Sequence, residues 1–307
     1  MDVVVPFRGT SAALNELQTR LSRLHLEPGD SLVVVDNTPG RGARAESGGE
    51  GVPVMQAAAL QTPGYARNRG VAAGRAEWLL FLDADVVAPE DLIERYFDPP
   101  AGERTALVAG GVIDEPAPGD ARLPPRWAQL QRSMSQDHTF RLEDWAFAQT
   151  SNLVCRRSAF EAAGGFRENI RAGEDADLTY RLKAAGWEIE RRESATVVHR
   201  SRQTVRAFIA QKALHGSGGA WLDRAYPGSF PPRRRPGLVW WGVRRATKGL
   251  LSAVWSRDGD EAVRALFDPL EQLAREFGRS LPNERPLPDG SLWRRVRFLG
   301  EDEVGGR

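Results

Sequence analysis

The amino-acid sequence predicts an α/β protein whose mostly parallel sheet is covered by helices on both faces. Three observations support this prediction. Strand and helix signals alternate along the first half of the chain, the strand signals are continuous apolar runs, and 307 residues are enough to bury a large core. Continuous apolar runs are typical of parallel strands, because crossover helices cover both of their faces.

The first half of the chain carries four strand signals, which are short runs rich in β-branched residues or leucine. They lie at 2–7, 31–37, 52–57 and 78–82. Leucines at helical spacing follow the first run, and Thr62 with Pro63 marks the start of a helix that precedes the fourth. These signals predict crossover helices between parallel strands.

The second half is less regular. We expect strands at 105–113, 187–193 and 195–200, and a strand that turns into a short helix within 149–166. We also expect a helical stretch with polar breaks at 127–144 and helices at 172–186 and from Thr204 onward. A helical stripe from Val263 to Phe277 is expected to restart near Pro269. A Pro/Arg-rich stretch divides the chain into a main domain (1–226), a linker (227–237) and a C-terminal amphipathic helical extension (238–307).

Composition limits the class of protein and its partners. The 42 lysines and arginines balance 41 aspartates and glutamates, which argues neither for nor against a polyanionic partner, and we expect no nucleic-acid partner. The single cysteine, Cys155, has no second cysteine with which to form an intramolecular disulfide, and the start lacks the sections of a secretory signal. These features predict a cytoplasmic protein.

The segment 237–255 is the most apolar long stretch of the chain. It falls short of the ~18 continuous apolar residues of a spanning helix, because three basic residues interrupt it. These are Arg244, Arg245 and Lys248. On a helical wheel the apolar residues share one arc and the basic residues the next. Two interpretations stay open: peripheral contact of 238–255 with the inner face of a membrane, or a helix packed on the domain with a solvated basic edge.

Polar side chains follow the carboxyl ends of three expected strands, where open α/β sheets bind their ligands. They are Arg8, which follows Pro6 and Phe7 at the end of the first strand, Asp36 after the second, and Asp83 and Asp85 after the fourth. As alternate residues leaving a strand, Asp83 and Asp85 can point the same way and offer hard oxygen ligands to Mg²⁺. The alternative is an acidic turn that caps the helix starting near Pro89.

Five motifs in order resemble the family 2 glycosyltransferases of the GT-A fold. They are VVVPFRG, LVVVDN, GYARNRGVAAGRAEWLLFLDAD with its DXD motif, SNLVCRRSAFEAAGGF and GEDADLTYRLKAAGW. The resemblance covers residues 2–200. It implies a GT-A type α/β fold and a hexosyltransferase-type enzyme that uses a nucleotide-diphospho-sugar donor.

The resemblance also implies a nucleotide site. The aspartate that corresponds to Asp36 contacts the base in this family, Pro6 and Phe7 line the same pocket, and Asp83 faces the ribose. The remaining residues that we assign to this site are Arg8, Arg67, Asn68 and Ala84. The sequence departs from the family pattern around PFRG and DNTPG, so the base stays open, with UDP first and GDP or dTDP as alternatives.

The resemblance assigns the metal and the catalytic base as well. Asp85 is expected to bind the Mg²⁺ or Mn²⁺ that bridges the diphosphate and stabilises the leaving group. His199 is expected to join that shell or contact the diphosphate, and a purely structural histidine is the alternative. Inverting relatives use the aspartate of an ED pair as general base, which makes Asp175 the candidate. Glu174 would orient it, and Asp177 is the second candidate.

Further assignments and alternatives complete the prediction. Asn152 is expected to line the donor-sugar or acceptor pocket, and Trp145 either stacks on a sugar or lipid there or merely packs. The acids at 174–177 have a second explanation, because helix starts favour acidic residues. We predict a metal-dependent inverting glycosyltransferase that transfers one sugar per encounter to an unidentified acceptor. A retaining enzyme, a nucleotidyltransferase or a degenerate nucleotide-sugar-binding protein are the alternatives.

Overall fold

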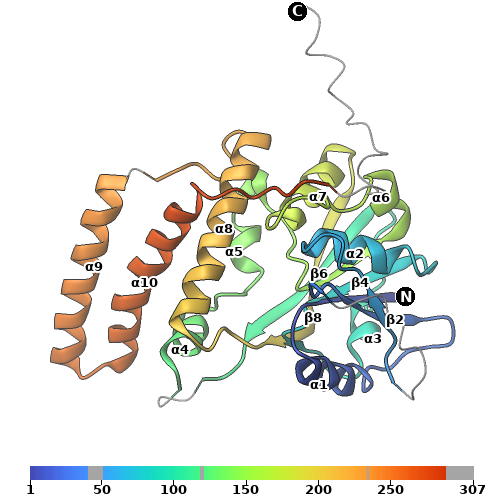
Figure 1. The fold of residues 1–307 in the computed structure, drawn as a ribbon, viewed down its shortest axis with the longest axis horizontal. Helices are drawn as coiled ribbons and strands as arrows, with labels where there is room; N and C mark the ends of the chain where they lie inside the picture. Colours follow the sequence, from blue (N-terminus) through green and yellow to red (C-terminus); the bar gives the residue numbers. More distant parts are fainter. Residues whose placement is uncertain (41–50, 118–120, 234, 288–307) are drawn as a thin grey trace, which may run out of the picture.

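The computed structural model describes residues 1–40, 51–117, 121–233 and 235–287. At its centre is an eight-stranded mixed sheet with the strand order β3-β2-β1-β4-β7-β6-β8-β5. The strands are β1 (Asp2–Phe7), β2 (Ser31–Asp36), β3 (Val54–Gln56), β4 (Trp78–Leu82), β5 (Val86–Val87), β6 (Thr105–Asp114), β7 (Asn152–Arg156) and β8 (Glu188–His199). Helices lie on both faces of this sheet (Figure 1), which confirms the predicted fold class.

Helices follow the strands in the order that the sequence predicts for the first half. They are α1 (Ser11–Leu21), α2 (Pro63–Val71), α3 (Leu92–Tyr96), α4 (Leu123–Gln131), α5 (Asp137–Phe140), α6 (Arg157–Ala162), α7 (Glu174–Ala184), α8 (Val205–Ala225), α9 (Arg235–Ser256) and α10 (Gly259–Gly278), with a short 3-10 turn, η1 (Glu143–Trp145). Thr10 caps α1 through its side chain, and Pro63 occupies the first position of α2.

Strand direction brings the polar strand ends together. Strands β3, β2, β1 and β4 are parallel, β7 is antiparallel to both β4 and β6, and β6 and β8 are again parallel. The carboxyl ends of β1, β2, β4, β6 and β8 and the amino end of β7 therefore meet along one edge of the sheet, which we call the polar edge.

Alternate residues of the central strands pack on opposite faces of the sheet, as the period of a strand requires. Val4 and Phe81 belong to the core under α2, α6 and α7, whereas Val5 and Leu80 belong to the core under α1 and α3. Helix α2 lies so close to β1 at Gly70 that a Cβ there would collide with Val4. This close packing places the side chains of α2 beside the polar edge.

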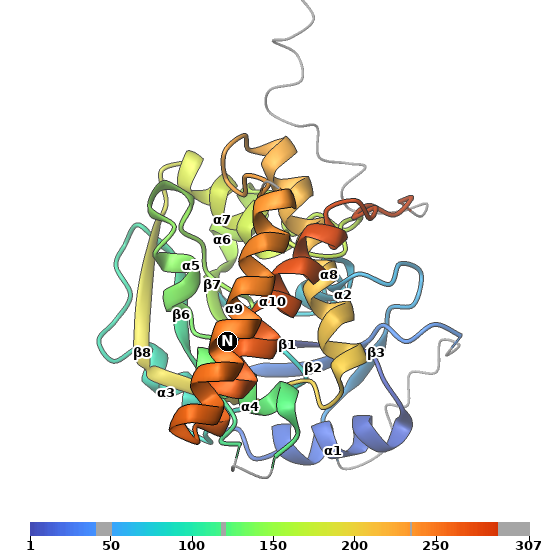
Figure 2. The same ribbon diagram turned by 90° about the vertical axis from the view of Figure 1, so that its left-hand side faces the viewer.

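Helices α8, α10 and α9 stack beside the sheet as a separate wall, with α9 outermost (Figures 1 and 2). Trp127 of α4, Phe208 of α8 and Phe267 of α10 share one buried cluster. The chain then returns to the main domain, where Glu284 forms a β-bridge with Ile170. The division of the chain at residue 226 stays a prediction, and the last part of the predicted extension, 288–307, lies outside the described residues.

Two local predictions for the second half are wrong. The segments 187–193 and 195–200 form one strand, β8, because the long β6 pairs with it along its whole length across two register irregularities. Helix α10 runs through Pro269 without a restart, since residues on both sides of the proline pack on α4 and α8. The prediction of a helical stretch with breaks at 127–144 is confirmed, because this stretch contains parts of the separate short elements α4, α5 and η1.

Candidate active site

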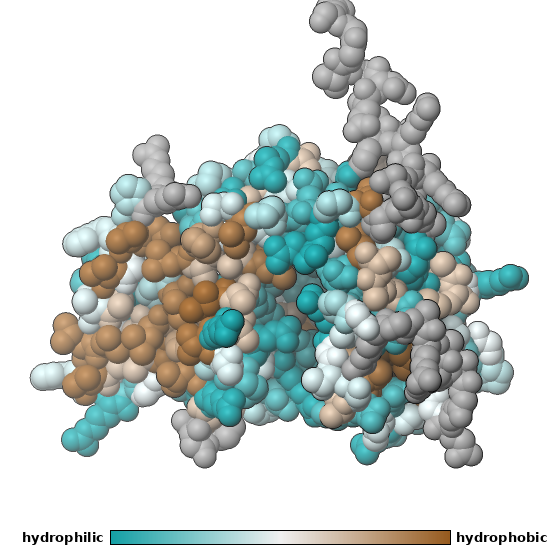
Figure 3. All heavy atoms as spheres, in the orientation of Figure 1, coloured by the Kyte–Doolittle hydropathy of each residue, from teal (hydrophilic) through white to brown (hydrophobic). Residues whose placement is uncertain are grey.

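A cleft of about 1540 Å³ separates the polar edge from the wall of α8 and α10. It opens as a hollow between hydrophilic surfaces in Figure 3. Ten predicted site residues line it: Pro6, Phe7, Arg8, Arg67, Asp83, Ala84, Asp85, Glu174, Asp175 and His199. The facing helices contribute Lys212, His215 and Arg275. The parallel strand ends and the start of α7 thus bring residues far apart in the sequence into one cavity.

Arg67 of α2 connects two carboxylates at the floor of this cleft. Its Nη2 donates to Asp83 Oδ1 at 2.7 Å, and its Nη1 donates to Glu174 Oε1 at 2.8 Å. Burial disfavours the charged guanidinium, but the two carboxylates outweigh burial and raise the pKa of Arg67. One permanently charged side chain therefore holds the end of β4 against the start of α7.

Asp175 lies in the first turn of α7, where Gly173 begins the helix with a φ of +88°. Its Oδ1 accepts a hydrogen bond of 2.8 Å from the backbone N–H of Ala176. Burial, and then the negative charge of Glu174, raise the pKa of Asp175 to about 7. A carboxyl group that exchanges its proton near neutral pH, on the surface of a cavity, suits general acid–base chemistry.

The raised pKa predicts a pH-dependent cost in stability at Asp175. The folded protein holds the proton up to about pH 7, whereas the unfolded chain releases it near pH 3.9. Proton binding by Asp175 therefore stabilises the folded protein in full below the unfolded value, and this stabilisation is lost as the pH rises through the folded value. We expect Asp175→Asn to melt a few degrees above wild type at about pH 8 and level with it at about pH 4. Calorimetric melting curves at both pH values test this, and equal melting at about pH 8 contradicts it.

A second group of ionisable side chains lies at the ends of β4, β6 and β8. Asp85 Oδ2 is 3.6 Å from His199 Nε2, and Asp114 Oδ1 is 3.5 Å from His199 Nδ1. Burial disfavours the imidazolium, but the two carboxylates outweigh it and raise the pKa of His199 to about 9. Burial likewise disfavours the charged form of Asp85, yet His199 and Arg202 lower its pKa.

This corner fits a divalent cation by the chemistry of its donors. Within the described ranges, no three His, Cys, Asp or Glu side chains form a complete metal site by themselves. Asp85 and His199 Nε2 nevertheless offer two ligands, and Mg²⁺ or Mn²⁺ commonly complete such a shell with phosphate oxygens and water. Asp114 lies beside the other ring nitrogen, Nδ1. In metal sites a carboxylate at this position commonly orients the histidine ring.

Comparison with known proteins identifies the family. Residues 78–257 match the family model described as Glycosyl transferase family group 2. The chain belongs to the family 2 glycosyltransferases. It is 30% identical over 238 residues to the pre-mycofactocin glycosyltransferase of Mycobacterium tuberculosis, covering 75% of this chain and 49% of that protein.

Two further proteins are similar to this chain, one in sequence and one in fold. The succinoglycan biosynthesis protein ExoA of Rhizobium meliloti is 28% identical over 168 residues, or 52% of this chain and 51% of ExoA. This glycosyltransferase thus spans about half the length of the curated relatives it matches. The mannosyltransferase PcManGT from Pyrobaculum calidifontis, solved in complex with GDP-Man and Mn²⁺, has a similar fold. Its TM-score is 0.59 at 12% identity, over 91% of this chain and 86% of PcManGT.

Asp36 of this family 2 glycosyltransferase lies behind the cleft surface instead of on it. The side chain is fully buried at the end of β2, where its carboxylate accepts from the backbone N–H of Thr38 at 2.9 Å and from Gln56 Nε2 at 3.2 Å. The next residue, Asn37, lines the cleft, and its Nδ2 donates to the carbonyl of Ala57 at 2.6 Å. The β2 end of the cleft therefore presents Asn37, which the sequence did not single out.

Two predicted asparagines are buried among structural partners. The Asn68 side chain donates a hydrogen bond to the backbone C=O of Phe166 and accepts one from its N–H. Asn152 accepts from the Tyr96 hydroxyl at 2.6 Å and donates to the carbonyls of Gly111 and Ala195. These bonds hold each side chain away from the cleft lining, so we assign both asparagines to the framework of this glycosyltransferase.

Asp177 and Trp145 also face protein. The fully buried carboxylate of Asp177 accepts from Arg167, Arg181 and the Tyr226 hydroxyl. The Trp145 ring packs edge-on against Tyr180, with 5.2 Å between ring centroids. Neither side chain reaches the cleft surface, which leaves Asp175 as the candidate base on α7 of this glycosyltransferase.

Sequence reasoning missed two residues, one that holds the loop carrying Asp83 and Asp85 and one that lies beside His199. Arg20 of α1 donates to the carbonyl oxygens of Ala84 at 2.8 Å and Val86 at 3.2 Å. Asp114 supports His199 from the end of β6. An acidic residue at the carboxyl end of an expected strand was a usable signal for Asp114. Arg20 gave none, because its role depends on how α1 packs beside the end of β4.

Proposed function

We propose that this protein moves one sugar from a nucleotide-diphosphate donor to an acceptor hydroxyl with inversion at the anomeric carbon. The observation that carries the proposal is the position of Asp175, whose pKa of about 7 suits a general base, in the same cleft as both aspartates of the DXD motif. The family and the GT-A type fold agree with this activity.

The residues of the cleft divide the reaction between them. Asp175 takes the proton of the acceptor hydroxyl while the hydroxyl oxygen attacks the anomeric carbon. The bond from that carbon to the donor diphosphate breaks, and its electron pair leaves with the diphosphate. Asp85 and His199 would hold a Mg²⁺ or Mn²⁺ ion, which supplies positive charge to the leaving diphosphate. Arg202, with its Nη2 3.3 Å from Asp85 Oδ2, keeps that carboxylate in place.

The base of the donor is proposed as uracil, with guanine and thymine as competitors. Pro6, Phe7 and Asn37 provide the cleft surface at the ends of β1 and β2. The similar fold of PcManGT holds GDP-Man, which makes GDP the first competitor to test. Asp36 supports this wall from behind through Thr38 and Gln56.

A thermal-shift and calorimetric screen of UDP, GDP, dTDP and CMP tests the proposed site. We expect one nucleotide to bind, and its binding to require both Mn²⁺ and Asp85. At a nucleotide concentration of about 100 times the dissociation constant, the folded state gains about 2.7 kcal/mol. Asp85→Ala should lose this gain, because it removes one of the two side chains proposed to hold the cation. Glu90→Ala, an exposed acidic neighbour, is the matched control and should respond like wild type. Equal responses of wild type and Asp85→Ala contradict the proposed metal site.

A further inference from the structure

The outermost helices expose a large apolar surface, which we call the outer apolar face. Its main members are Trp240, Leu251, Val254 and Trp255 of α9, with Leu266 and Phe277 of α10. Leu251 is 72% exposed, Val254 79% and Trp255 93%. Figure 3 shows this hydrophobic surface spread over α9 and α10, on the same side of the molecule as the hollow of the cleft. Contiguous apolar surface of this kind marks an interaction site.

Packing within the protein does not use these side chains. The inward side of α9 carries small residues, and at Gly249 a Cβ would lie 2.6 Å from the Cβ of Ala265 on α10. Leu238 and Ala253 are buried on the same side. Helices α9 and α10 therefore already pack closely through one side of α9, and the large apolar residues remain on the other.

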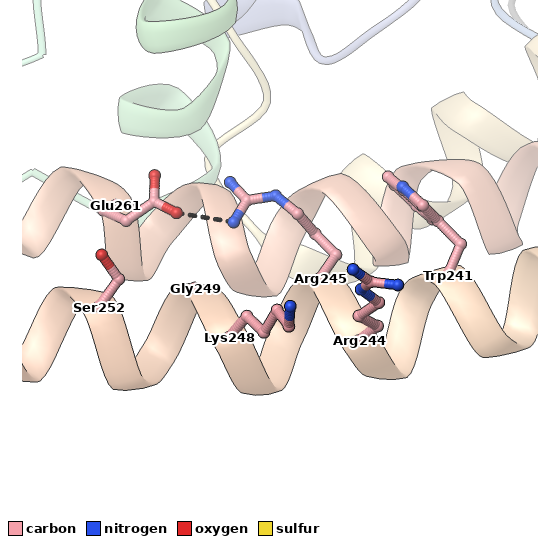
Figure 4. A pocket seen from close by; sticks show the side chains of 7 residues that line it. All are labelled: Trp241, Arg244, Arg245, Lys248, Gly249, Ser252 and Glu261. Carbon is pink, nitrogen blue, oxygen red and sulfur yellow. Dashed lines mark hydrogen bonds and ion pairs between the residues drawn. The ribbon is translucent and has the colours of Figure 1, made fainter.

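A basic notch borders the outer apolar face. It is a pocket of about 380 Å³ between α9 and α10, and Arg244, Arg245 and Lys248 lie along it with Trp241 at one end (Figure 4). Arg245 Nη1 donates to Glu261 Oε1 at 2.7 Å, so these two charges compensate each other. No ion pair or hydrogen bond from the side chain of Arg244 or Lys248 is found within the described part of the chain. The notch therefore presents two positive charges that no carboxylate of the described residues compensates.

We propose that the outer apolar face docks on the surface of a membrane that contains anionic lipids, with a lipid phosphate in the basic notch. Tryptophan and leucine beside lysine and arginine are typical of helices that lie in the membrane interface. Among residues that the structure describes, no helix is long and apolar enough to cross a bilayer, so the contact lies in the membrane plane. Docking brings the mouth of the cleft close to the lipid head groups.

The notch distinguishes a lipid surface from a second copy of the chain. A symmetric dimer through the outer apolar face would bring two sets of Arg244 and Lys248 close together, and like charges oppose that contact. An anionic lipid surface instead attracts both residues, each with roughly a fivefold gain in binding. Charge complementarity therefore favours the membrane.

Vesicle flotation tests the proposal with the whole chain. Wild type should bind vesicles with about 30% phosphatidylglycerol in phosphatidylcholine and bind pure phosphatidylcholine at least about tenfold more weakly. The double variant Arg244→Glu/Lys248→Glu should lose at least about tenfold in binding to the anionic vesicles. The double variant Arg23→Glu/Arg75→Glu changes the charge by the same amount at two exposed arginines outside α9 and α10, and as the matched control it should bind like wild type.

A second pair of variants tests the apolar contribution. Leu251→Ser/Trp255→Ser should lose binding to anionic vesicles, whereas Leu26→Ser, at 41% exposure elsewhere, should keep it. Trp255→Phe keeps an apolar ring and should retain most of the binding, and a melting curve like that of wild type shows that the double variant is folded. Equal binding to both vesicle types, or no binding by wild type, overturns the proposal. A dimer in light scattering that the apolar variant dissociates, without vesicle binding, also overturns it.

Discussion

Replacement of Asp175 by asparagine is expected to lower the turnover number of sugar transfer by roughly 10²–10⁴-fold. The amide keeps the shape of the side chain and can still accept the hydrogen bond from the Ala176 N–H. What it loses is the ability to take a proton from the acceptor. Binding of the donor nucleotide should stay within about threefold of wild type, because the proposed cation ligands are elsewhere in the cleft.

The matched control for this variant is two residues away on the same helix. Asp177→Asn weakens ion pairs with Arg167 and Arg181, so it should lower the melting temperature while the folded enzyme keeps its turnover number. The pair of variants therefore separates a catalytic carboxylate from a structural one. If Asp177→Asn lost turnover and Asp175→Asn retained it, then Asp177 would be the catalytic carboxylate and Asp175 the structural one.

The pH profile and the product give two more readouts of the same proposal. As a general base, Asp175 must be deprotonated, so kcat/KM of wild type should rise with pH and level off above about 7. Asp175→Asn should lose this rising limb. NMR of the product should show the opposite anomeric configuration to that of the donor, and a retained configuration contradicts the assignment of Asp175 as base.

The sequence predicted the polar edge because strand order and strand direction follow from local patterns. Apolar runs of parallel strands ended at Phe7, Asp36 and Asp83, and the carboxyl ends of such strands must meet. The start of α7 was readable from its acids. Local patterns were therefore enough to predict that the carboxyl ends of β1, β2 and β4 lie together.

The framework residues were harder to predict because their partners are distant in the chain. The sequence predicts Asn152 as a site residue. In the structure its side-chain oxygen accepts a hydrogen bond from the hydroxyl of Tyr96, 56 positions away. Asp36 is similar, since Gln56 from the neighbouring strand encloses it. A polar side chain at a strand end can line a cleft or form hydrogen bonds within the protein interior. Tertiary packing determines which of these two positions it takes. Local sequence carries no signal for that choice.

Arg67 is the clearest case of such a long-range role, and its replacement should cause the largest loss of stability. Arg67→Met leaves Glu174, whose side chain is 8% exposed, without its cation, and it frees Asp83 as well. Removal of one partner of a buried ion pair costs about 3–5 kcal/mol. We expect a decrease of this size in the free energy of unfolding, measured by urea denaturation near neutral pH.

A second substitution should restore part of the lost stability, because the cost comes from an uncompensated buried charge and not from a missing side chain. Glu174→Gln removes that charge, so Arg67→Met/Glu174→Gln should unfold at a higher urea concentration than Arg67→Met alone. Arg95→Met breaks a half-exposed ion pair with Asp91 and should cost about 1 kcal/mol or less. If Arg67→Met were no less stable than Arg95→Met, or the double variant less stable than the single one, then Arg67 would not hold the cleft floor together through its charge.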